Sequence, residues 1–247
     1  MKIFSKALYI SFARFVKEIF KDYLLTAMTI LPLFLGLLFK LGIPTLELFI
    51  QNKTGLAEII TPYYILFDLT IIFSTPVMFG YAGLMVILEE RDNGIMKYLC
   101  VTPLRTRGYL FSRLIFLSAL ASLYGFIIEI IFHLSDITIL QIFLGSLFSF
   151  FTGIWLVCLI TLLASNKVEG LAFSKFSGLL ILGPFASFFL NDWIKYLTGF
   201  LPTFWFTEFC LKQDTQGTYG IVSLIISFAI TGLYVAVTIS RFGKKVS

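Results

Sequence analysis

Histidine and cysteine are scarce in this chain, with one His and three Cys in 247 residues. The lone His133 excludes a multi-histidine metal centre, and the cysteines are too few and too widely spaced for a disulfide framework or a zinc site. The sequence also lacks a Gly-x-x-x-x-Gly-Lys-Ser/Thr loop of the kind that cradles the phosphates of ATP. We therefore predict a protein that is not an enzyme and that binds no metal or cofactor itself.

Charged residues are scarce as well. They make up 13% of the chain, whereas soluble domains carry roughly 25%. Hydrophobic residues make up 58% and include 29 Phe, and a chain so poor in polar side chains cannot cover its core in water. A lipid bilayer accepts apolar surface on the outside of a protein. The composition therefore predicts a membrane protein whose partners include lipid and not nucleic acid.

Six apolar segments are long enough to cross a bilayer, which takes about 20 residues of helix. The predicted spans lie at about 24–41, 63–88, 114–132, 139–164, 171–190 and 219–240. They predict an all-α membrane protein with one six-span transmembrane domain over 23–247. The first apolar run is too long for the core of a cleavable signal peptide, so we expect the N-terminus to be retained.

Residues 1–22 show a different pattern. On a helical wheel of about 3.6 residues per turn, basic side chains fall on one arc and apolar side chains on another. The basic arc holds Lys2, Lys6, Arg14, Lys17 and Lys21, and the apolar arc holds Phe4, Leu8, Phe12, Phe15, Val16 and Ile19. We predict an amphipathic helix that lies in the headgroup layer with its lysines toward anionic lipid. The alternative is an ordinary amphipathic helix packed on protein.

The distribution of basic residues favours one orientation. With both termini cytoplasmic, 15 of the 19 Lys and Arg residues lie inside, and those outside are Lys40, Lys53, Lys195 and Lys212. Counting the ambiguous stretch 193–211 as a further span would place the basic C-terminal tail outside. We therefore predict that 193–211 is an external or re-entrant element between spans 5 and 6. The expected location is a bacterial cytoplasmic (inner) membrane, with both termini inside.

The segment 89–108, between the second and third spans, is the most strongly charged stretch of the chain. Asp92 or Asn93 can cap the start of a short helix. Pro103 disfavours helical geometry at Thr102, so we expect this helix to end just before Thr102. Residues at helical spacing give the helix a small apolar face, which consists of Ile95, Met96 and Leu99.

The pattern Glu90-Arg91-Asp92-x-Gly94, followed by a leucine and Thr102-Pro103, resembles a motif of ABC-2 type transporter permeases. These permeases are the membrane subunits of ATP-binding-cassette exporters, and their motif lies between the second and third spans. The overall plan is similar too, and the stretch 166–172 resembles the family's second cytoplasmic loop. Two positions depart from the family pattern: Ile95 replaces a small residue, and Arg113 replaces a lysine but keeps its charge.

The resemblance implies partners and site residues. A separate ATPase subunit would bind ATP and Mg²⁺, and a second permease copy or a related permease chain would complete the pathway. The implied coupling segment comprises Glu90, Arg91, Asp92, Gly94, Ile95, Met96, Leu99, Thr102 and Pro103, and the second cytoplasmic loop contributes Lys167 and Glu169. We expect the apolar face of the coupling helix to lie in a cleft of the ATPase, with Glu90 and Asp92 on basic or helix-N-terminal groups of that partner. The alternative is a solvated loop whose charges only enforce the topology.

Three ionisable residues fall inside predicted spans: Asp68, Glu129 and Lys40. A carboxylate at mid-bilayer costs about 2.5–3.5 kcal/mol on insertion scales, so such residues are usually functional or reach water near the surface. Both readings are open for Asp68 and for Glu129. Because Asp68 and Lys40 lie at similar depths near the outer side, we expect them to form an ion pair.

These observations predict the permease subunit of an ATP-driven exporter. A pathway rich in Phe, Leu and Ile favours an amphipathic or hydrophobic substrate, such as a drug, a peptide or a lipid. One alternative is a small secondary transporter driven by an ion gradient, which generally shows repeats and helices broken at the midplane. Another is a membrane-embedded lipid-modifying enzyme, which needs clustered His, Asp or Glu at a membrane face. The sequence shows neither feature.

Overall fold

The computed structural model describes residues 2–56, 58–102, 108–109, 111–190, 192–212 and 217–246. Within these ranges the regular structure is helical and contains no β-strand. Six helical segments of this part of the chain are long and apolar enough to cross a membrane: Tyr23–Thr54, Thr61–Asp92, Phe111–Phe132, Ile139–Leu163, Lys167–Phe189 and Thr218–Phe242. The protein is therefore an all-α membrane protein with six transmembrane helices, as predicted.

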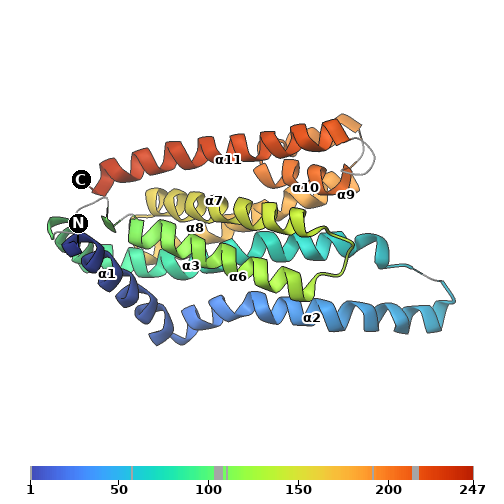
Figure 1. The fold of residues 1–247 in the computed structure, drawn as a ribbon, viewed down its shortest axis with the longest axis horizontal. Helices are drawn as coiled ribbons and strands as arrows, with labels where there is room; N and C mark the ends of the chain where they lie inside the picture. Colours follow the sequence, from blue (N-terminus) through green and yellow to red (C-terminus); the bar gives the residue numbers. More distant parts are fainter. Residues whose placement is uncertain are drawn as a thin grey trace.

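The elements follow one another in a simple order. They are α1 (Lys2–Lys21), α2 (Tyr23–Thr54), η1 (Thr61–Tyr63), α3 (Tyr64–Asp92), α4 (Ile95–Val101), η2 (Phe111–Ile115), α6 (Phe116–Phe132), α7 (Ile139–Leu163), α8 (Lys167–Ser174), η3 (Lys175–Ile181), α9 (Leu182–Phe189), η4 (Asp192–Thr198), α10 (Pro202–Lys212) and α11 (Gly217–Val246). The long helices lie side by side, and α1, α4 and the last turns of α11 share one end of the bundle (Figure 1). We name it the α1 end. That it faces the cytoplasm stays a prediction.

Helix α3 is the centre of the bundle. It contacts α2, α6 and α7 along its length, and most of its apolar side chains are buried. Two hydrophobic clusters meet along it. The cluster nearer the α1 end contains Phe15, Leu84, Leu88 and Met96, and the cluster toward the opposite end contains Leu69, Phe73, Phe148, Phe206 and Phe209. Because α3 is packed on all sides, its C-terminal end has a fixed position, and the start of α4 is fixed with it.

The first span is longer than its predicted end at residue 41. Helix α2 passes through Pro44 and continues to Thr54, because neighbouring turns supply enough hydrogen bonds to tolerate a proline inside a transmembrane helix. The buried Glu47 carboxylate then ties the connection to α3 back onto α2. It accepts hydrogen bonds from the backbone N–H of Thr61 (2.9 Å) and from the hydroxyls of Thr61 and Tyr64.

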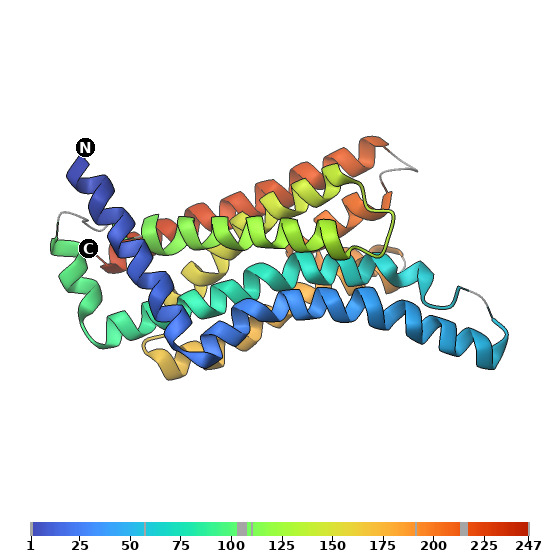
Figure 2. The same ribbon diagram turned by 60° about the horizontal axis from the view of Figure 1, so that its bottom comes forward.

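Helix α1 lies obliquely across its end of the bundle (Figure 2). Its apolar arc faces protein, because Phe15 and Ile19 are buried in the cluster at the α1 end. Arg14, Lys17 and Lys21 are exposed. The apolar face therefore packs on the transmembrane domain, which is the alternative that the sequence left open. A position of the basic arc in the headgroup layer stays a prediction, as does the division into 1–22 and 23–247.

The fifth span is irregular, and a folded-back element follows it. The span runs through α8, the 3₁₀ segment η3 and α9. The eleven-residue α10 is too short to cross a membrane and packs against α9 and α11 at the end opposite α1 (Figure 1). Gly183 allows the close approach, because a Cβ atom there would lie 2.4 Å from Thr203 Oγ1. The interrupted segment predicted at 193–211 is thus a non-spanning element between spans 5 and 6.

Candidate coupling site and buried carboxylates

A sharp turn joins α3 to α4 at the α1 end. Helix α3 continues through Asp92, and Gly94 makes the turn with a φ of 71°, a left-handed conformation that favours glycine. The expectation that Asp92 or Asn93 caps the short helix is therefore wrong, because these residues end the preceding helix. Helix α4 ends before Thr102, which is extended with a ψ of 174° as a following proline requires. Pro103 itself lies outside the described residues.

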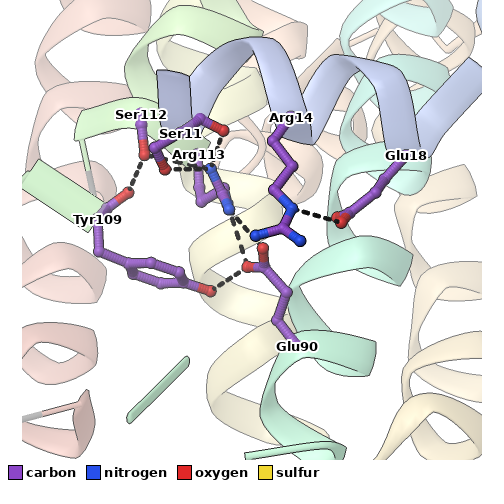
Figure 3. Close-up of polar contacts among 7 residues, drawn as sticks. All are labelled: Ser11, Arg14, Glu18, Glu90, Tyr109, Ser112 and Arg113. Atoms are coloured by element: carbon purple, nitrogen blue, oxygen red, sulfur yellow. Dashed lines mark hydrogen bonds and ion pairs between the residues drawn. The ribbon is translucent and has the colours of Figure 1, made fainter. Parts of the chain in front are cut away.

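A buried ion pair holds the end of α3. Arg113 in η2 donates from Nε to Glu90 Oε2 over 3.1 Å and from Nη2 to Glu90 Oε1 (Figure 3). The hydroxyl of Tyr109 also donates to Glu90 Oε2, over 2.9 Å. Both charged residues are almost fully buried, with 4% of Glu90 and 1% of Arg113 exposed. The fork of the guanidinium suits such a pair, because it meets both carboxylate oxygens at once.

Arg113 also connects α1 to this ion pair. Its Nη1 donates to the backbone oxygen of Ser11 over 3.0 Å and to Ser11 Oγ over 2.9 Å, and its guanidinium lies 4.6 Å from the centre of the Phe15 ring. One side chain therefore joins α1, α3 and the start of the third span. Sequence reasoning missed Ser11 and Tyr109. The signal for Ser11 was its place at the edge of the apolar arc of α1, beside Phe15 on the helical wheel.

Two grooves, of about 700 and 480 Å³, separate α1 from α3 and α4. Glu18 and Glu90 line both of them. Burial and the neighbouring charge of Glu90 raise the pKa of the Glu18 carboxyl above its ordinary value, against the lowering effects of Arg113 and Arg14. The grooves leave α4 attached to the bundle along one side and open along the other.

The second loop at this end meets the first through α7. Arg91 donates to the backbone oxygens of Thr161 (3.1 Å) and Ala164 (2.7 Å). These oxygens lie at the C-terminal end of α7, where carbonyl groups have no partner within the helix and basic side chains are favourable. Arg91 therefore links the end of α3 to the end of α7.

Lys167, in the stretch singled out as the second cytoplasmic loop, reinforces this contact. Its ammonium lies 2.8 Å from Glu89 Oε2, and its backbone N–H donates to Asp92 Oδ2 over 3.0 Å. Glu169 acts within its own loop, since its carboxylate accepts from the backbone N–H of Ser165 over 2.7 Å. The structure thus brings the two predicted loops together, and Lys167 is the residue of the second loop that contacts the first.

The exposed face of α4 differs from the one predicted. Met96 is 5% exposed and Leu99 is half-buried against the cluster at the α1 end, so these two side chains pack within the chain. Tyr98 and Val101 are exposed by 71% and 83%, and Ile95 by 42%. The expectation that Met96 and Leu99 face a partner, and that Glu90 pairs with basic groups of that partner, is corrected accordingly. The coupling role of the segment stays a prediction.

Asp68 and Lys40 do not pair with each other. The Asp68 carboxylate accepts from the backbone N–H groups of Leu134 (2.9 Å) and Ser135 (2.8 Å) and from the Ser135 hydroxyl. Lys40 Nζ donates to the backbone oxygen of His133 over 2.7 Å. Both residues therefore bind the turn after α6, each through its own atoms. Sequence reasoning placed them at a similar depth but could not see that this turn lies between them.

We expect Asp68→Asn to lower stability by about 1–3 kcal/mol, because buried donors of the turn lose an acceptor. Adding Lys40→Met should not recover this loss, since the two side chains do not touch and independent effects add. Thermal unfolding of the purified single and double variants in detergent measures both effects. Recovery of stability in the double variant would show an ion pair that the structure does not contain.

Glu129 on α6 lies inside the bundle. It is 1% exposed, so of the two readings that the sequence left open for Glu129, the one in which it reaches water near the surface does not hold. Neither of its carboxylate oxygens has a hydrogen-bond partner among the described residues. These residues also contain no group of three or more His, Cys, Asp or Glu that could hold a metal ion. Glu129 is thus a buried acid without a hydrogen-bond partner in the part of the chain that the structure describes.

Comparison with family models gives a match over most of the chain. The model of a family described as "Rv2686c-like: Fluoroquinolones export permease protein Rv2686c-like" matches residues 15–239. This match extends from within α1 into the last turns of α11, so it covers five transmembrane helices fully and the sixth up to residue 239. No curated protein matches the chain.

Proposed function

The chain belongs to the Rv2686c-like family of fluoroquinolone export permeases, and on this premise we propose that it is the membrane subunit of an ATP-driven exporter. A separate ATPase of the cassette type binds ATP and Mg²⁺ and docks at the α1 end, which faces the cytoplasm of a bacterial cell. Two permease chains, either two copies or this chain and a related one, form the pathway. The substrate is an amphipathic or hydrophobic molecule, and a drug of the fluoroquinolone type fits both the family and the apolar spans.

The observation that carries this proposal is that α4 is packed on the bundle along one side and exposes apolar side chains on the other. Its inner side is fixed through Met96 and through the buried Glu90–Arg113 pair at the end of α3. Its exposed side presents the apolar and aromatic side chains of Ile95, Tyr98 and Val101, of which Ile95 and Tyr98 also line the grooves that face α1. A helix that only joined two spans would gain nothing from such a surface in water. A push on α4 would pass into α3, the central helix, and through Arg113 into α1 and the third span.

Residues Lys167 and Glu89 extend this mechanism to the second loop. Their ion pair and the Asp92 contact hold α8 against the end of α3, so a movement of the α3–α4 turn also reaches the fifth span. The same end of the molecule thus connects to α1, α3, α6, α7 and α8. This is the arrangement that an ATPase needs if one contact is to move several helices together.

The exposed apolar side chains of α4 provide the test, because the ATPase is proposed to dock on them. In a complex of the purified permease with a cassette ATPase encoded beside it, Tyr98→Asp and Val101→Asp should each prevent co-purification. ATP hydrolysis should then fall to the rate of the ATPase alone, because a carboxylate replaces an apolar contact at the centre of the interface. The control is Lys97→Ala, which changes an exposed residue on the same helix without placing a carboxylate among its apolar side chains. Wild-type binding and hydrolysis in both aspartate variants would contradict the proposal.

A further inference from the structure

Glu129 is the exception among the buried carboxylates of the described residues. The other buried carboxylates have several hydrogen-bond donors each. Glu47 and Glu208 each contact at least four donor groups, and Asp68 and Glu90 each accept hydrogen bonds from three donor groups. Glu129 is as deeply buried as these, but both of its oxygens lack a partner within the described residues. A charged carboxylate left in this state costs several kcal/mol, whereas a neutral acid costs far less.

The charged and titratable groups around Glu129 do not supply a cation. On α3 the neighbour is Asp68, which is itself acidic, and on α10 it is the thiol of Cys210. The ammonium of Lys40 on α2 is directed to the backbone oxygen of His133, and the His133 ring contacts the backbone oxygen of Glu129 rather than its carboxylate. Helix α7 carries no Lys, Arg or His. No cation among the described residues therefore pairs with Glu129, and a positive charge there would come from outside this part of the chain.

A cluster of aromatic residues lies next to neighbours of Glu129. Phe126, one turn before Glu129 on α6, packs against the cluster that contains Phe73, Phe148 and Phe206. Cys210, which lies within electrostatic range of Glu129, belongs to this cluster too. Aromatic faces attract organic cations and offer them apolar contact. An unpaired acid beside a group of phenylalanines has the chemistry that binds a lipophilic cation, with the acid holding the charge and the rings holding the apolar body.

We propose that Glu129 is the residue at which the transmembrane domain binds the positively charged group of a lipophilic organic cation, and that it carries a proton while the site is empty. This inference rests on the proposed function, because it names the class of substrate that the exporter takes. When the helices around α6 part and the cation enters, the acid releases its proton to water and the carboxylate pairs with the cation. When the cation leaves, a proton from water returns to the carboxylate.

Labelling with dicyclohexylcarbodiimide tests the inference on the purified full-length permease without any ATPase. This reagent adds covalently to protonated carboxyl groups in apolar surroundings. The added mass can be located on a residue by mass spectrometry of the peptides. We expect Glu129 to be modified, and saturating tetraphenylphosphonium to slow its modification at least fivefold. Triphenylphosphine oxide is the matched probe without a charge and should leave the rate unchanged. Asp68, whose oxygens are occupied by donors, should react more slowly and serves as the internal control.

Equilibrium binding gives a second readout. Binding of tetraphenylphosphonium to Glu129→Gln should be at least tenfold weaker than to wild type, and Glu129→Asp should recover part of the loss. An unreactive Glu129, or protection that the neutral probe gives equally, would overturn the inference whether or not the variants fold. These outcomes are separate from those of the α4 variants. A protected Glu129 with no ATPase binding would remove the proposed coupling alone, and normal coupling with an unprotected Glu129 would remove the cation site alone.

Discussion

Arg113→Ala should destabilise the permease by about 3–5 kcal/mol, the range expected when one partner of a buried ion pair is removed. Among the described residues, Glu90 would then keep the hydroxyl of Tyr109 as its donor, and Ser11 would lose its link to the third span. Thermal unfolding in detergent measures the loss. Because Arg113 links α1 to α3 by hydrogen bonds, in addition to the apolar packing between these helices, stimulation of the ATPase should fall in the same variant even at temperatures where it remains folded.

Two further variants separate charge from geometry. Arg113→Lys keeps the positive charge, but an ammonium cannot reach both oxygens of Glu90 and also Ser11, so an intermediate stability is expected. The double variant Glu90→Gln with Arg113→Met removes both charges and should recover a large part of the stability, because no buried charge is left unpaired. If it recovers stability without ATPase stimulation, the ion pair is needed for coupling beyond its effect on folding. Wild-type stability in Arg113→Ala would contradict the buried pair itself.

Glu208→Gln should produce the second large effect, at the opposite end of the molecule. Its carboxylate accepts from Ser187 (2.6 Å) and Lys195 (2.8 Å), and Lys212 Nζ lies 3.1 Å away. These contacts hold α9, η4 and α10 together. The variant would leave Lys195, which is almost buried, without its counter-charge. We expect a loss at the lower end of about 3–5 kcal/mol, because Lys212 is partly exposed and can turn to water.

The pH dependence of this effect has a definite sign. Burial raises the pKa of Glu208, but the hydrogen bonds from Lys195, Ser187 and Lys212 outweigh it and hold the pKa below its ordinary value of 4.5. A carboxyl whose pKa is lower in the folded state contributes stability above the unfolded value and loses it as the pH falls through the folded value. The difference between wild type and Glu208→Gln should therefore be full at pH 7 and shrink below about pH 4.5. Unfolding curves across this range measure it, and a difference that grows in acid would contradict the assignment.

The sequence predicted well those features that depend on local composition. Five of the six spans begin and end within a few residues of their predicted limits, because insertion into a bilayer depends on the hydrophobicity of the segment itself. The end of α4 just before Thr102 followed from the proline after it. The exception is the end of α2, which continues through Pro44 because a membrane helix tolerates a proline.

The contacts of the candidate site could not be derived in this way. The charged residues of 89–92 were recognised as unusual, but their distribution between the interior and the surface was not. Glu90 turns inward to Arg113, Arg91 reaches α7, and Asp92 meets Lys167. Which way each side chain points depends on how α3 is rotated against its neighbours, and a span that is apolar all round gives no periodic signal of that rotation.

The sequence alone thus determined that this chain is a six-span membrane protein, that a short helix follows its second span, and that acidic residues lie inside its spans and directly after the second one. Only the tertiary structure decided which of those acids are satisfied. Asp68 obtains donors from a turn 66 and 67 residues away, Glu90 obtains Arg113 from 23 residues away, and Glu129 obtains no partner within the described residues. Span formation depends on the transfer of each segment into lipid, whereas the state of a buried charge depends on atoms that other helices bring to within about 3 Å of it.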